Sequence, residues 1–409
     1  MKVNINKSIA NGTVKAQPSK SYAHRLLIAC ALSKNESVIN NIVLSNDILA
    51  TINCIKALGK EVIIEGDYIK TITIKNNESF NINEKEEIIF DCLESGSTLR
   101  FFIPIALLLN KKVVFKGTKK LISRGIQVYE DICVNQNIQV IKEEEQITFI
   151  GKLQPDQFLI PGNISSQFIS GLLFALPLLD EDSCITLTTQ LESKNYIDIT
   201  IDVLKQAGII IENKSKKDYY ILSNQEYDLT NCEVEGDHSN AAFLDALNYL
   251  DGNVTMLGLN KNSYQGDKVY SNLFEQLNQS YCECDIKNCI DLGPILFAFA
   301  SLKHGGCFTG VNRLRIKESD RISDIKEELL KFNIDFIEED DRVIINNKNI
   351  TKPNEVLNGK NDHRIVMALS IMLTKFGGII EGFEAVNKSY PSFFEDLKSL
   401  GIEVCYEQI

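Results

Sequence analysis

Hydrophobic and polar positions repeat in one order along this chain: a short apolar run, a polar junction, a stretch of helical period and a second apolar run. β-Branched runs such as those at Val113 and Ile185 predict strands. Apolar residues that share one helical face predict amphipathic helices. Two such faces are formed by Ile199, Val203 and Leu204, and by Ile325, Leu329 and Leu330. Six copies of the pattern begin at Glu36, Lys111, Ser183, Gly252, Gly306 and Gly377.

The length of each copy indicates the kind of fold. The interval between copies is mostly about 70 residues, with one shorter step, which is longer than the solenoid period of about 20 to 50 residues. We therefore expect each repeat to form a compact unit of strands and helices. A chain of 409 residues is long enough for two or three domains. The pattern therefore predicts a mixed α/β (α+β) protein.

Composition and charge exclude some classes of protein function. The chain is 44% hydrophobic and 24% charged, with a net charge of −12, which argues against a general nucleic-acid binder. No apolar run is long enough to span a membrane, and the first residues lack the apolar core of a secretion signal. We expect a soluble protein in the cytoplasm.

Cysteine spacing gives no reason to expect a metal. The 11 cysteines are scattered, as expected for reduced and mostly buried thiols. The tightest group, Cys282, Cys284 and Cys289, lacks the spacing of a zinc site, and the chain has only four histidines. We predict no metal.

Basic residues stand where several helices are predicted to begin. The stretch QPSKSYAHR places Lys20 and Arg25 at the start of an apolar helix, where the helix dipole disfavours positive charge. Helix starts with free N–H groups bind anions well. We therefore predict an anionic ligand there. The same argument applies to Arg124, Lys317, Arg321 and Lys388, whereas Ser389 and Asp267 are equally well explained as helix caps.

Other segments add polar groups and acids to this set. SGSTLRFF, from Ser95, and GNISSQF, from Gly162, are typical of turns that bind phosphate or hydroxyl groups, although such turns are common in loops. Asp291 lies at the start of an apolar helix, and Glu318 lies between Lys317 and Arg321. An acid beside cations can act as a general acid or base.

The motifs together resemble a known family. QPSKSYAHR, SGSTLR, SRGI, GNISSQF, ESKNYIDIT, VEGDHSNAA, RIKESDR, GKNDHRIVMAL and NKSYPSFF occur in this order. They are similar to the 3-phosphoshikimate 1-carboxyvinyltransferase (EPSP synthase) family over nearly the whole chain. The resemblance implies an inverse αβ barrel of two domains, each with three βαβαββ units. Domain one would comprise residues 1–18 and 234–409, domain two residues 19–233, with the active site in the cleft between them.

The resemblance also implies a reaction. Enolpyruvyl transfer from phosphoenolpyruvate to the 5-hydroxyl of shikimate 3-phosphate would proceed through a tetrahedral intermediate and release phosphate, in aromatic amino acid biosynthesis. It implies no cofactor, no partner beyond these small-molecule substrates, and a monomer. Asp291 would be the base for the 5-hydroxyl, and Glu318 the proton donor to the methylene carbon, assisted by Lys20.

The family's binding residues carry over by position. Shikimate 3-phosphate would be held by Lys20, Ser21, Arg25, Ser165, Ser166, Gln167, Ser193, Tyr196, Asp291 and Lys317. Phosphoenolpyruvate would be held by Lys20, Gly96, Ser97, Arg124, Gln167, Arg321, Arg364 and Lys388. The chain departs from the family pattern at Ser97, Asn195 and Arg313, where threonine, proline and, in some members, asparagine occur; none of these changes removes a catalytic group.

Three alternatives stand beside this interpretation. UDP-N-acetylglucosamine enolpyruvyl transferase shares the fold and the donor, but it lacks the K-S-x-x-x-R start and usually carries a reactive cysteine or aspartate near residues 110–120, where this chain has no cysteine. A binding-only homologue would lack Glu318, Asp291 or Lys20. A structural role is the simpler explanation for His24, His363, Glu235 and Asp237.

Overall fold

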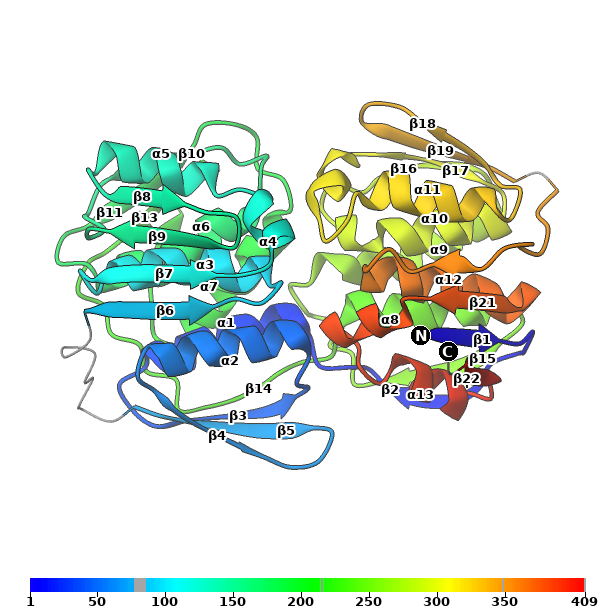
Figure 1. Ribbon diagram of the computed structural model, residues 1–409, viewed down its shortest axis with the longest axis horizontal. Coiled ribbons are helices and arrows are strands. Elements are labelled where there is room, and N and C mark those ends of the chain that lie inside the picture. Colours follow the sequence, from blue (N-terminus) through cyan, green and yellow to red (C-terminus); the bar gives the residue numbers. More distant parts are fainter. Residues whose placement is uncertain (77–85, 214, 216, 348, 408–409) are drawn as a thin grey trace. The chain divides into compact units, whose positions relative to one another are not determined.

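The chain divides into two compact units in a computed structural model, which describes residues 1–76, 86–213, 215, 217–347 and 349–407 (Figure 1). The continuous unit is Pro18–Glu235, and the discontinuous unit combines Met1–Gln17 with Gly236–Ile409. The boundaries expected from the sequence lie after residue 18 and before residue 234. Each unit is considered by itself below.

The continuous unit repeats one order of elements. Its helices are α1 (Lys20–Leu32), α2 (Asn46–Ala57), α3 (Gly96–Leu107), α4 (Lys119–Ser123), α5 (Gln127–Asn135), α6 (Ser166–Ala175) and α7 (Lys194–Gln206). Its strands are β3 (Ser37–Ile42), β4 (Glu61–Glu65), β5 (Lys70–Lys75), β6 (Glu87–Asp91), β7 (Lys112–Lys116), β8 (Gln139–Lys142), β9 (Gln146–Ile150), β10 (Gln157–Ile160), β11 (Ser183–Leu187), β12 (Ile211–Asn213), β13 (Asp218–Ile221) and β14 (Asn231–Glu233).

These strands form three four-stranded sheets of one topology. The sheet orders are β14-β3-β5-β4, β6-β7-β9-β8 and β10-β11-β13-β12. In each sheet the first two strands are parallel, and the other two pair antiparallel. A parallel pair needs a crossover, whereas an antiparallel pair needs only a short turn. Helix α3 connects β6 to β7 and α6 connects β10 to β11, but β14 comes at the end of the unit and returns beside β3. The pattern is the βαβαββ unit that the family resemblance implies.

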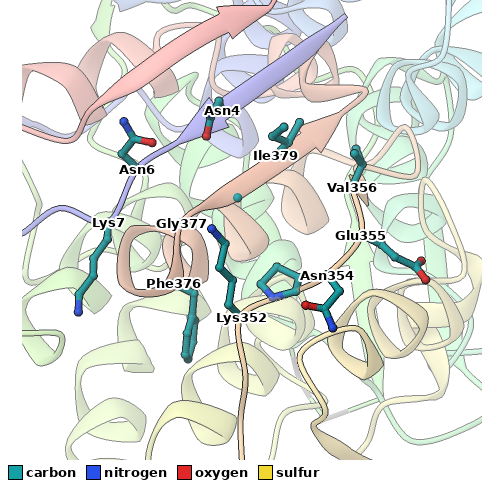
Figure 2. A pocket seen from close by; sticks show the side chains of 12 residues that line it. Asn4, Asn6, Lys7, Lys352, Asn354, Glu355, Val356, Phe376, Gly377 and Ile379 are labelled. Atoms are coloured by element: carbon teal, nitrogen blue, oxygen red, sulfur yellow. The ribbon is translucent and has the colours of Figure 1, made fainter.

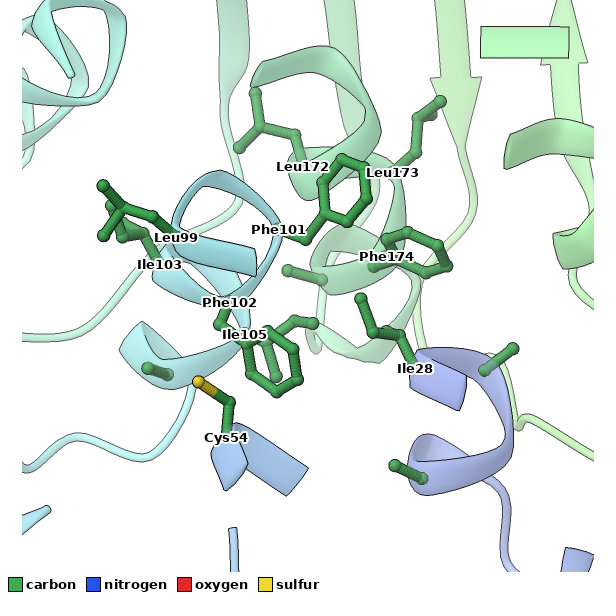
Figure 3. Close-up of a cluster of buried hydrophobic side chains, with 14 of the residues drawn as sticks. Ile28, Cys54, Leu99, Phe101, Phe102, Ile103, Ile105, Leu172, Leu173 and Phe174 are labelled. Carbon is green, nitrogen blue, oxygen red and sulfur yellow. The ribbon is translucent and has the colours of Figure 1, made fainter. Parts of the chain in front are cut away.

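The core of the continuous unit is made of helices. Every residue from Tyr22 to Ala31 in α1 and almost every residue of α3 and α6 is buried, so these helices are covered on all sides. Strands such as β10 instead alternate buried and exposed residues, as expected for a sheet with one face on the core. Figure 3 shows Phe101, Leu172 and Phe174 of α3 and α6 packed together near Ile28 of α1. Apolar helices therefore lie inside, and sheets cover them.

The discontinuous unit follows the same plan. Its helices are α8 (His238–Asp245), α9 (Tyr270–Gln279), α10 (Gly293–Leu302), α11 (Arg321–Leu330), α12 (His363–Phe376) and α13 (Phe393–Ser399). Its strands are β1 (Lys2–Ile5), β2 (Asn11–Lys15), β15 (Asn253–Leu257), β16 (Cys282–Asp285), β17 (Gly306–Thr309), β18 (Asp335–Glu338), β19 (Arg342–Asn346), β20 (Leu357–Asn358), β21 (Gly378–Glu381) and β22 (Val404–Glu407). Helices α10 and α12 are buried along nearly their whole length.

The third sheet of this unit differs from the others. Sheets β20-β21-β1-β22 and β16-β17-β19-β18 have four strands, but among the described residues β15 pairs only with β2. The predicted mixed fold of repeated strand and helix units is confirmed. One predicted helical face is wrong in part: Ile325 and Leu329 are buried, but Leu330 is 51% exposed. Five positions turn a helix by about 500°, which places Leu330 well away from Ile325.

Two predictions about the whole chain can be compared with the structure. Seven of the cysteines are buried, three are partly buried, Cys405 is exposed, and all eleven are free thiols. The expectation of mostly buried cysteines is confirmed. Within the described part of the chain, no helix is both long and apolar enough to cross a membrane.

Candidate active site

The first helix begins where the sequence predicts, but its cation has a partner in the chain. Ser19 caps α1 by accepting a hydrogen bond from the Tyr22 amide, so Lys20 occupies the first helical position. Lys20 Nζ lies 2.9 Å from Asp47 Oδ2. Lys20 therefore has a counter-ion within the chain, and the anionic ligand expected beside it stays a prediction. The Lys20 side chain is only 16% exposed, and Asp47 holds its ammonium group in place.

Arg25 is different, because its polar contacts with the described residues are all to neutral groups. Its side chain is buried, with Nε 2.7 Å from Thr200 Oγ1, Nη1 2.8 Å from the Ser21 carbonyl and Nη2 3.0 Å from the Tyr196 carbonyl. Among the described residues it forms no ion pair. Burial lowers its pKa to about 10, although Tyr196 and Tyr22 oppose this shift. A buried guanidinium without a counter-ion would gain from a bound anion.

A second cation adjoins the start of α3. A methyl group added to Gly96 would lie 2.9 Å from Arg124 Nη1, so the guanidinium packs against the helix start at Gly96. Arg124 Nε is buried and has no hydrogen-bond partner among the described residues. Arg124 was expected to begin a helix, but it follows the short helix α4, and α5 begins only at Gln127. The Arg124 backbone thus ends α4, while its guanidinium lies at the N–H end of α3, where a bound anion would offset the unfavourable meeting of two positive ends.

Gln167 joins two of the predicted segments. Its Nε2 donates to Ser97 Oγ at 2.9 Å, and its Oε1 accepts from Arg100 Nη1 at 2.6 Å. Ser165 caps α6, so Ser166 and Gln167 occupy its first turn. The Ser97 and Gln167 side chains are thus fixed beside the N-terminal ends of α3 and α6.

The start of α7 supplies one more polar group to this unit. Ser193 is completely buried and precedes α7 in a left-handed conformation, with φ of 51°. Such a backbone costs about 1–3 kcal/mol in a residue other than glycine, and it often occurs at functional sites. Tyr196 follows in the first turn, and its carbonyl holds Arg25. The continuous unit thus carries Lys20, Ser21, Arg25, Gly96, Ser97, Arg124, Ser165, Ser166, Gln167, Ser193 and Tyr196.

In the discontinuous unit, Arg321 is surrounded by carboxylates. It is the first residue of α11 and only 1% exposed. Its Nε lies 2.8 Å from Asp362 Oδ2, its Nη1 2.9 Å from Asp291 Oδ1 and its Nη2 2.6 Å from Glu318 Oε2. Burial alone would lower the pKa of Arg321, but Asp362, Glu318 and Asp291 together raise it. Carboxylates of the chain therefore compensate this cation, and the anionic ligand expected at Arg321 stays a prediction.

Asp291 is shared by several cations. It lies in the 3₁₀ turn Ile290–Leu292 before α10, where Oδ1 is 3.1 Å from Lys317 Nζ and Oδ2 is 3.8 Å from Arg364 Nη2. Burial lowers the pKa of Lys317, and Asp291 opposes that shift. The two acids predicted to perform chemistry, Asp291 and Glu318, are therefore both bonded to Arg321.

Two further predicted cations surround the start of α12. Asp362 caps this helix by accepting from the Arg364 amide at 2.9 Å. The Arg364 guanidinium is buried, with Nη1 3.4 Å from Asn240 Oδ1 and with Nε lacking a hydrogen-bond partner within the described part of the chain. Lys388 Nζ donates to the Asn361 carbonyl at 2.8 Å.

The structure corrects the backbone position of two of these cations. Lys317 and Lys388 were expected at helix starts. Lys317 instead follows the 3₁₀ segment Asn312–Ile316, and Lys388 ends the 3₁₀ segment Phe383–Lys388. Both lie at C-terminal ends, where the backbone dipole favours a cation.

Asp267 adds a buried acid to this set. It accepts a short hydrogen bond from Ser239 Oγ, while its Oδ1 has no partner among the described residues. Burial raises its pKa to about 7, and the charges of Asp291 and Asp237 add to this, against Ser239 and Arg364.

The residues interpreted as structural have structural contacts. His24 is buried with Nδ1 2.7 Å from Thr51 Oγ1, and burial, followed by Lys20 and Arg25, lowers its pKa well below the ordinary value. His363 is the buried first residue of α12. Asp237 caps α8 through the Asn240 amide at 2.8 Å. His24 and Asp237 thus have structural contacts, and the structural interpretation of His363 stays a prediction.

The sequence analysis did not predict the hydrogen-bond and ion-pair partners of the candidate site residues. These are Asp47 beside Lys20, Thr200 beside Arg25, Arg100 beside Gln167, and Asp362 as the counter-ion of Arg321. Arg100 and Asp362 lie in motifs that were singled out, so the residue types gave a signal. Asp47 and Thr200 gave none, because each meets its partner only in the folded unit.

A separate hollow lies away from these residues. It has a volume of about 410 Å³ and is lined by Asn4, Asn6, Lys7, Lys352, Pro353, Asn354, Glu355, Val356, Phe376, Gly377, Gly378 and Ile379 (Figure 2). Phe376 and Gly377 lie at the C-terminal end of α12, whereas Asp362 and Arg364 lie at its start. A 14-residue helix is about 21 Å long, so this hollow is not part of the site.

Comparisons with known proteins agree on one family. Residues 5–397 match a model of the family described as EPSP synthase (3-phosphoshikimate 1-carboxyvinyltransferase). A 3-phosphoshikimate 1-carboxyvinyltransferase of Clostridium kluyveri is 40% identical over 98% of both chains, and one of Clostridium acetobutylicum is 42% identical over 98% of both.

Solved structures share the fold. An EPSP synthase from Acinetobacter baumannii superposes with a TM-score of 0.76 and 20% identity, covering 99% of this chain and 100% of that one. The enolpyruvyl transferase NikO from Streptomyces tendae has a TM-score of 0.76 and 11% identity, covering 100% of this chain and 99% of that one.

Proposed function

Because the chain belongs to the EPSP synthase family, we propose that it transfers the enolpyruvyl group of phosphoenolpyruvate to the 5-hydroxyl of shikimate 3-phosphate. The products are 5-enolpyruvylshikimate 3-phosphate and phosphate, on the route to aromatic amino acids. The observation that carries the proposal is that Arg321 holds both Asp291 and Glu318. One buried guanidinium thus fixes a candidate base and a candidate acid.

The reaction assigns one proton transfer to each acid. Asp291 takes the proton of the 5-hydroxyl group, while the oxygen of that hydroxyl group forms a bond to C2 of phosphoenolpyruvate. Glu318, assisted by Lys20, gives a proton to C3, which produces a tetrahedral intermediate with a methyl group. In the second step Glu318 removes a proton from that methyl group, the C2–O bond to phosphate breaks, and phosphate leaves with the electron pair. General acid and base groups of this kind each contribute about 10²- to 10⁴-fold to the rate.

Both substrates are anionic, which suits the basic residues that each of the two units carries. We assign shikimate 3-phosphate to Lys20, Ser21, Arg25, Ser165, Ser166, Gln167, Ser193, Tyr196, Asp291 and Lys317. We assign phosphoenolpyruvate to Lys20, Gly96, Ser97, Arg124, Gln167, Arg321, Arg364 and Lys388. Arg25 supports the assignment because its described contacts are neutral, and the buried Nε groups of Arg124 and Arg364 support it because they lack partners among the described residues. Clamps of this kind stabilise developing negative charge.

One assay tests the reaction and its nearest rival. Phosphate release from phosphoenolpyruvate is measured with shikimate 3-phosphate or with UDP-N-acetylglucosamine as acceptor, without added metal. We expect release only with shikimate 3-phosphate. Release only with the nucleotide sugar would assign the rival activity, and release with neither would favour a binding-only protein, which calorimetry with each substrate would then detect. We also propose that the chain acts as a monomer in the cytoplasm; light scattering on the purified protein tests its mass.

A further inference from the structure

Glu328 is a fully buried carboxylate that the proposed chemistry does not use. It lies on α11, two helical turns after Arg321, and its side chain has no exposed surface. Burying a charge costs several kcal/mol unless the group is paired. Its contacts should therefore show what it holds in place.

The Glu328 carboxylate connects α11 to the segment that leads into β20. Its Oε2 accepts from the Asn358 amide at 2.9 Å and from Lys331 Nζ at 2.8 Å, and its Oε1 lies 3.5 Å from Lys360 Nζ. Lys331 Nζ also donates to the Val356 carbonyl at 3.2 Å. One carboxylate thus fixes the chain on both sides of Leu357.

The turn that follows β20 is strained. Lys360 and Asn361 are consecutive and both have φ of 52°, in the left-handed region. This region is strained for residues other than glycine, and asparagine tolerates it better than lysine. The Lys360 amide donates to Asn358 Oδ1 at 2.7 Å, so the anchored residue Asn358 also closes this turn.

This turn holds the cations assigned to phosphoenolpyruvate. The Asn361 carbonyl accepts from Lys388 Nζ at 2.8 Å. Asp362, the next residue, binds Arg321 and caps the helix that carries Arg364. A shift of the turn would move Lys388, Arg321 and Arg364 together.

We propose that Glu328 is a positioning residue for phosphoenolpyruvate, which acts by holding the Asn358–Asn361 turn in its strained conformation. The inference rests on the proposed function. It predicts a selective effect, because among the assigned shikimate 3-phosphate residues only Asp291 touches Arg321 or Arg364 directly. The Lys20, Arg25, Ser165 and Ser193 assignments lie in the other unit.

The test compares Glu328→Gln with Glu327→Gln. Glutamine keeps the size of the side chain but removes the charge that faces Lys331 and Lys360. Glu327 is a matched control, because it is adjacent on α11 and also binds Lys360, with Oε1 2.7 Å from Nζ. Its side chain is 60% exposed, however, and the Asn358 amide donates to Glu328 instead. Initial rates are measured against each substrate with the other saturating.

We expect Glu328→Gln to raise the KM for phosphoenolpyruvate about tenfold, the equivalent of about 1.4 kcal/mol. The KM for shikimate 3-phosphate should change less than about twofold, and Glu327→Gln should change neither. The additional substitution Lys360→Gly should restore part of the loss, because glycine adopts positive φ without strain. Unchanged kinetics, equal changes in both KM values, or no rescue would overturn the assignment.

A second variant keeps the test decisive if Glu328→Gln does not fold. Lys331→Met removes one donor to Glu328 and to Val356 without burying a new charge, and it should raise the KM for phosphoenolpyruvate alone. Failure to do so would then overturn the assignment. If the wild type turns over the two substrates and the variants have the same kinetic constants, only the role of Glu328 is rejected. A wild type without turnover rejects the proposed function as well.

Discussion

Arg321 Nε lies 2.8 Å from Asp362 Oδ2, and both side chains are almost completely buried. Asp362 also caps α12 and accepts from Ser319 Oγ at 3.3 Å. One carboxylate therefore joins the start of α11 to the start of α12. The pair fixes α11 and α12, which carry assigned site residues. Its removal should therefore lower both the free energy of unfolding and the rate of catalysis.

Asp362→Asn should destabilise the protein by about 3 kcal/mol, because breaking a buried ion pair leaves a buried charge less compensated. Asparagine is as good a helix cap as aspartate, so the capping contribution stays nearly constant. Urea unfolding measures the change. The control is Glu339→Gln, which breaks the exposed pair with Arg342 and should cost less than about 1 kcal/mol. Equal losses in the two variants would contradict the importance of burial.

Glu318→Gln should fold normally and turn over about 10²- to 10⁴-fold more slowly, because it removes the proposed proton donor while Arg321 keeps two other carboxylates. The measurement is kcat for phosphate release, with thermal melting as a check on folding. Near-normal turnover in a folded variant would remove Glu318 from its proposed role.

Gly96→Ala should raise the KM for phosphoenolpyruvate, because the new methyl group would lie 2.9 Å from Arg124 Nη1 and displace the guanidinium. We expect an effect on the order of tenfold, equivalent to about 1.4 kcal/mol. A double-mutant cycle with Arg124→Ala provides the control. Once Arg124 is absent, Gly96→Ala should have little further effect. Additive effects of the two substitutions would show that the methyl group acts elsewhere.

Asp267→Asn should change how stability depends on pH. Burial, with Asp291 and Asp237 adding to it, raises the pKa of Asp267 to about 7 from an ordinary value of 3.8, against Ser239 and Arg364. The folded protein therefore holds a proton that the unfolded chain releases, and the free energy of unfolding falls as pH rises from about 4 to 7.

The Asp267→Asn variant lacks this titration, so its Tm should fall less over that range than the Tm of the wild type. Thermal melts of both proteins at several pH values give the difference in Tm at each pH. The contributions of the other titrating groups cancel in this difference. Parallel curves would show that Asp267 titrates normally.

The family and the order of its strands and helices could be predicted from the sequence, because both depend on local sequence patterns. Runs such as those at Val113 and Ile185 lie in β7 and β11, and the apolar helices are the buried ones. The face that included Leu330 was wrong, because an apolar residue near a helix end need not share the buried side. The expected domains and site assignments stay predictions.

The sequence by itself determined which cations and acids this protein would bring to its candidate site, because residue types and their motifs are local properties. Only the tertiary structure decided their partners. Lys20 meets Asp47 from 27 residues away, and Arg321 meets Asp362 from 41 residues away. Helix-start electrostatics predicted an anionic ligand at each place, but it could not predict the carboxylates of the chain, because long-range packing brings them to Lys20 and Arg321. Arg25 has no such partner among the described residues, and there the prediction of an external anion stands.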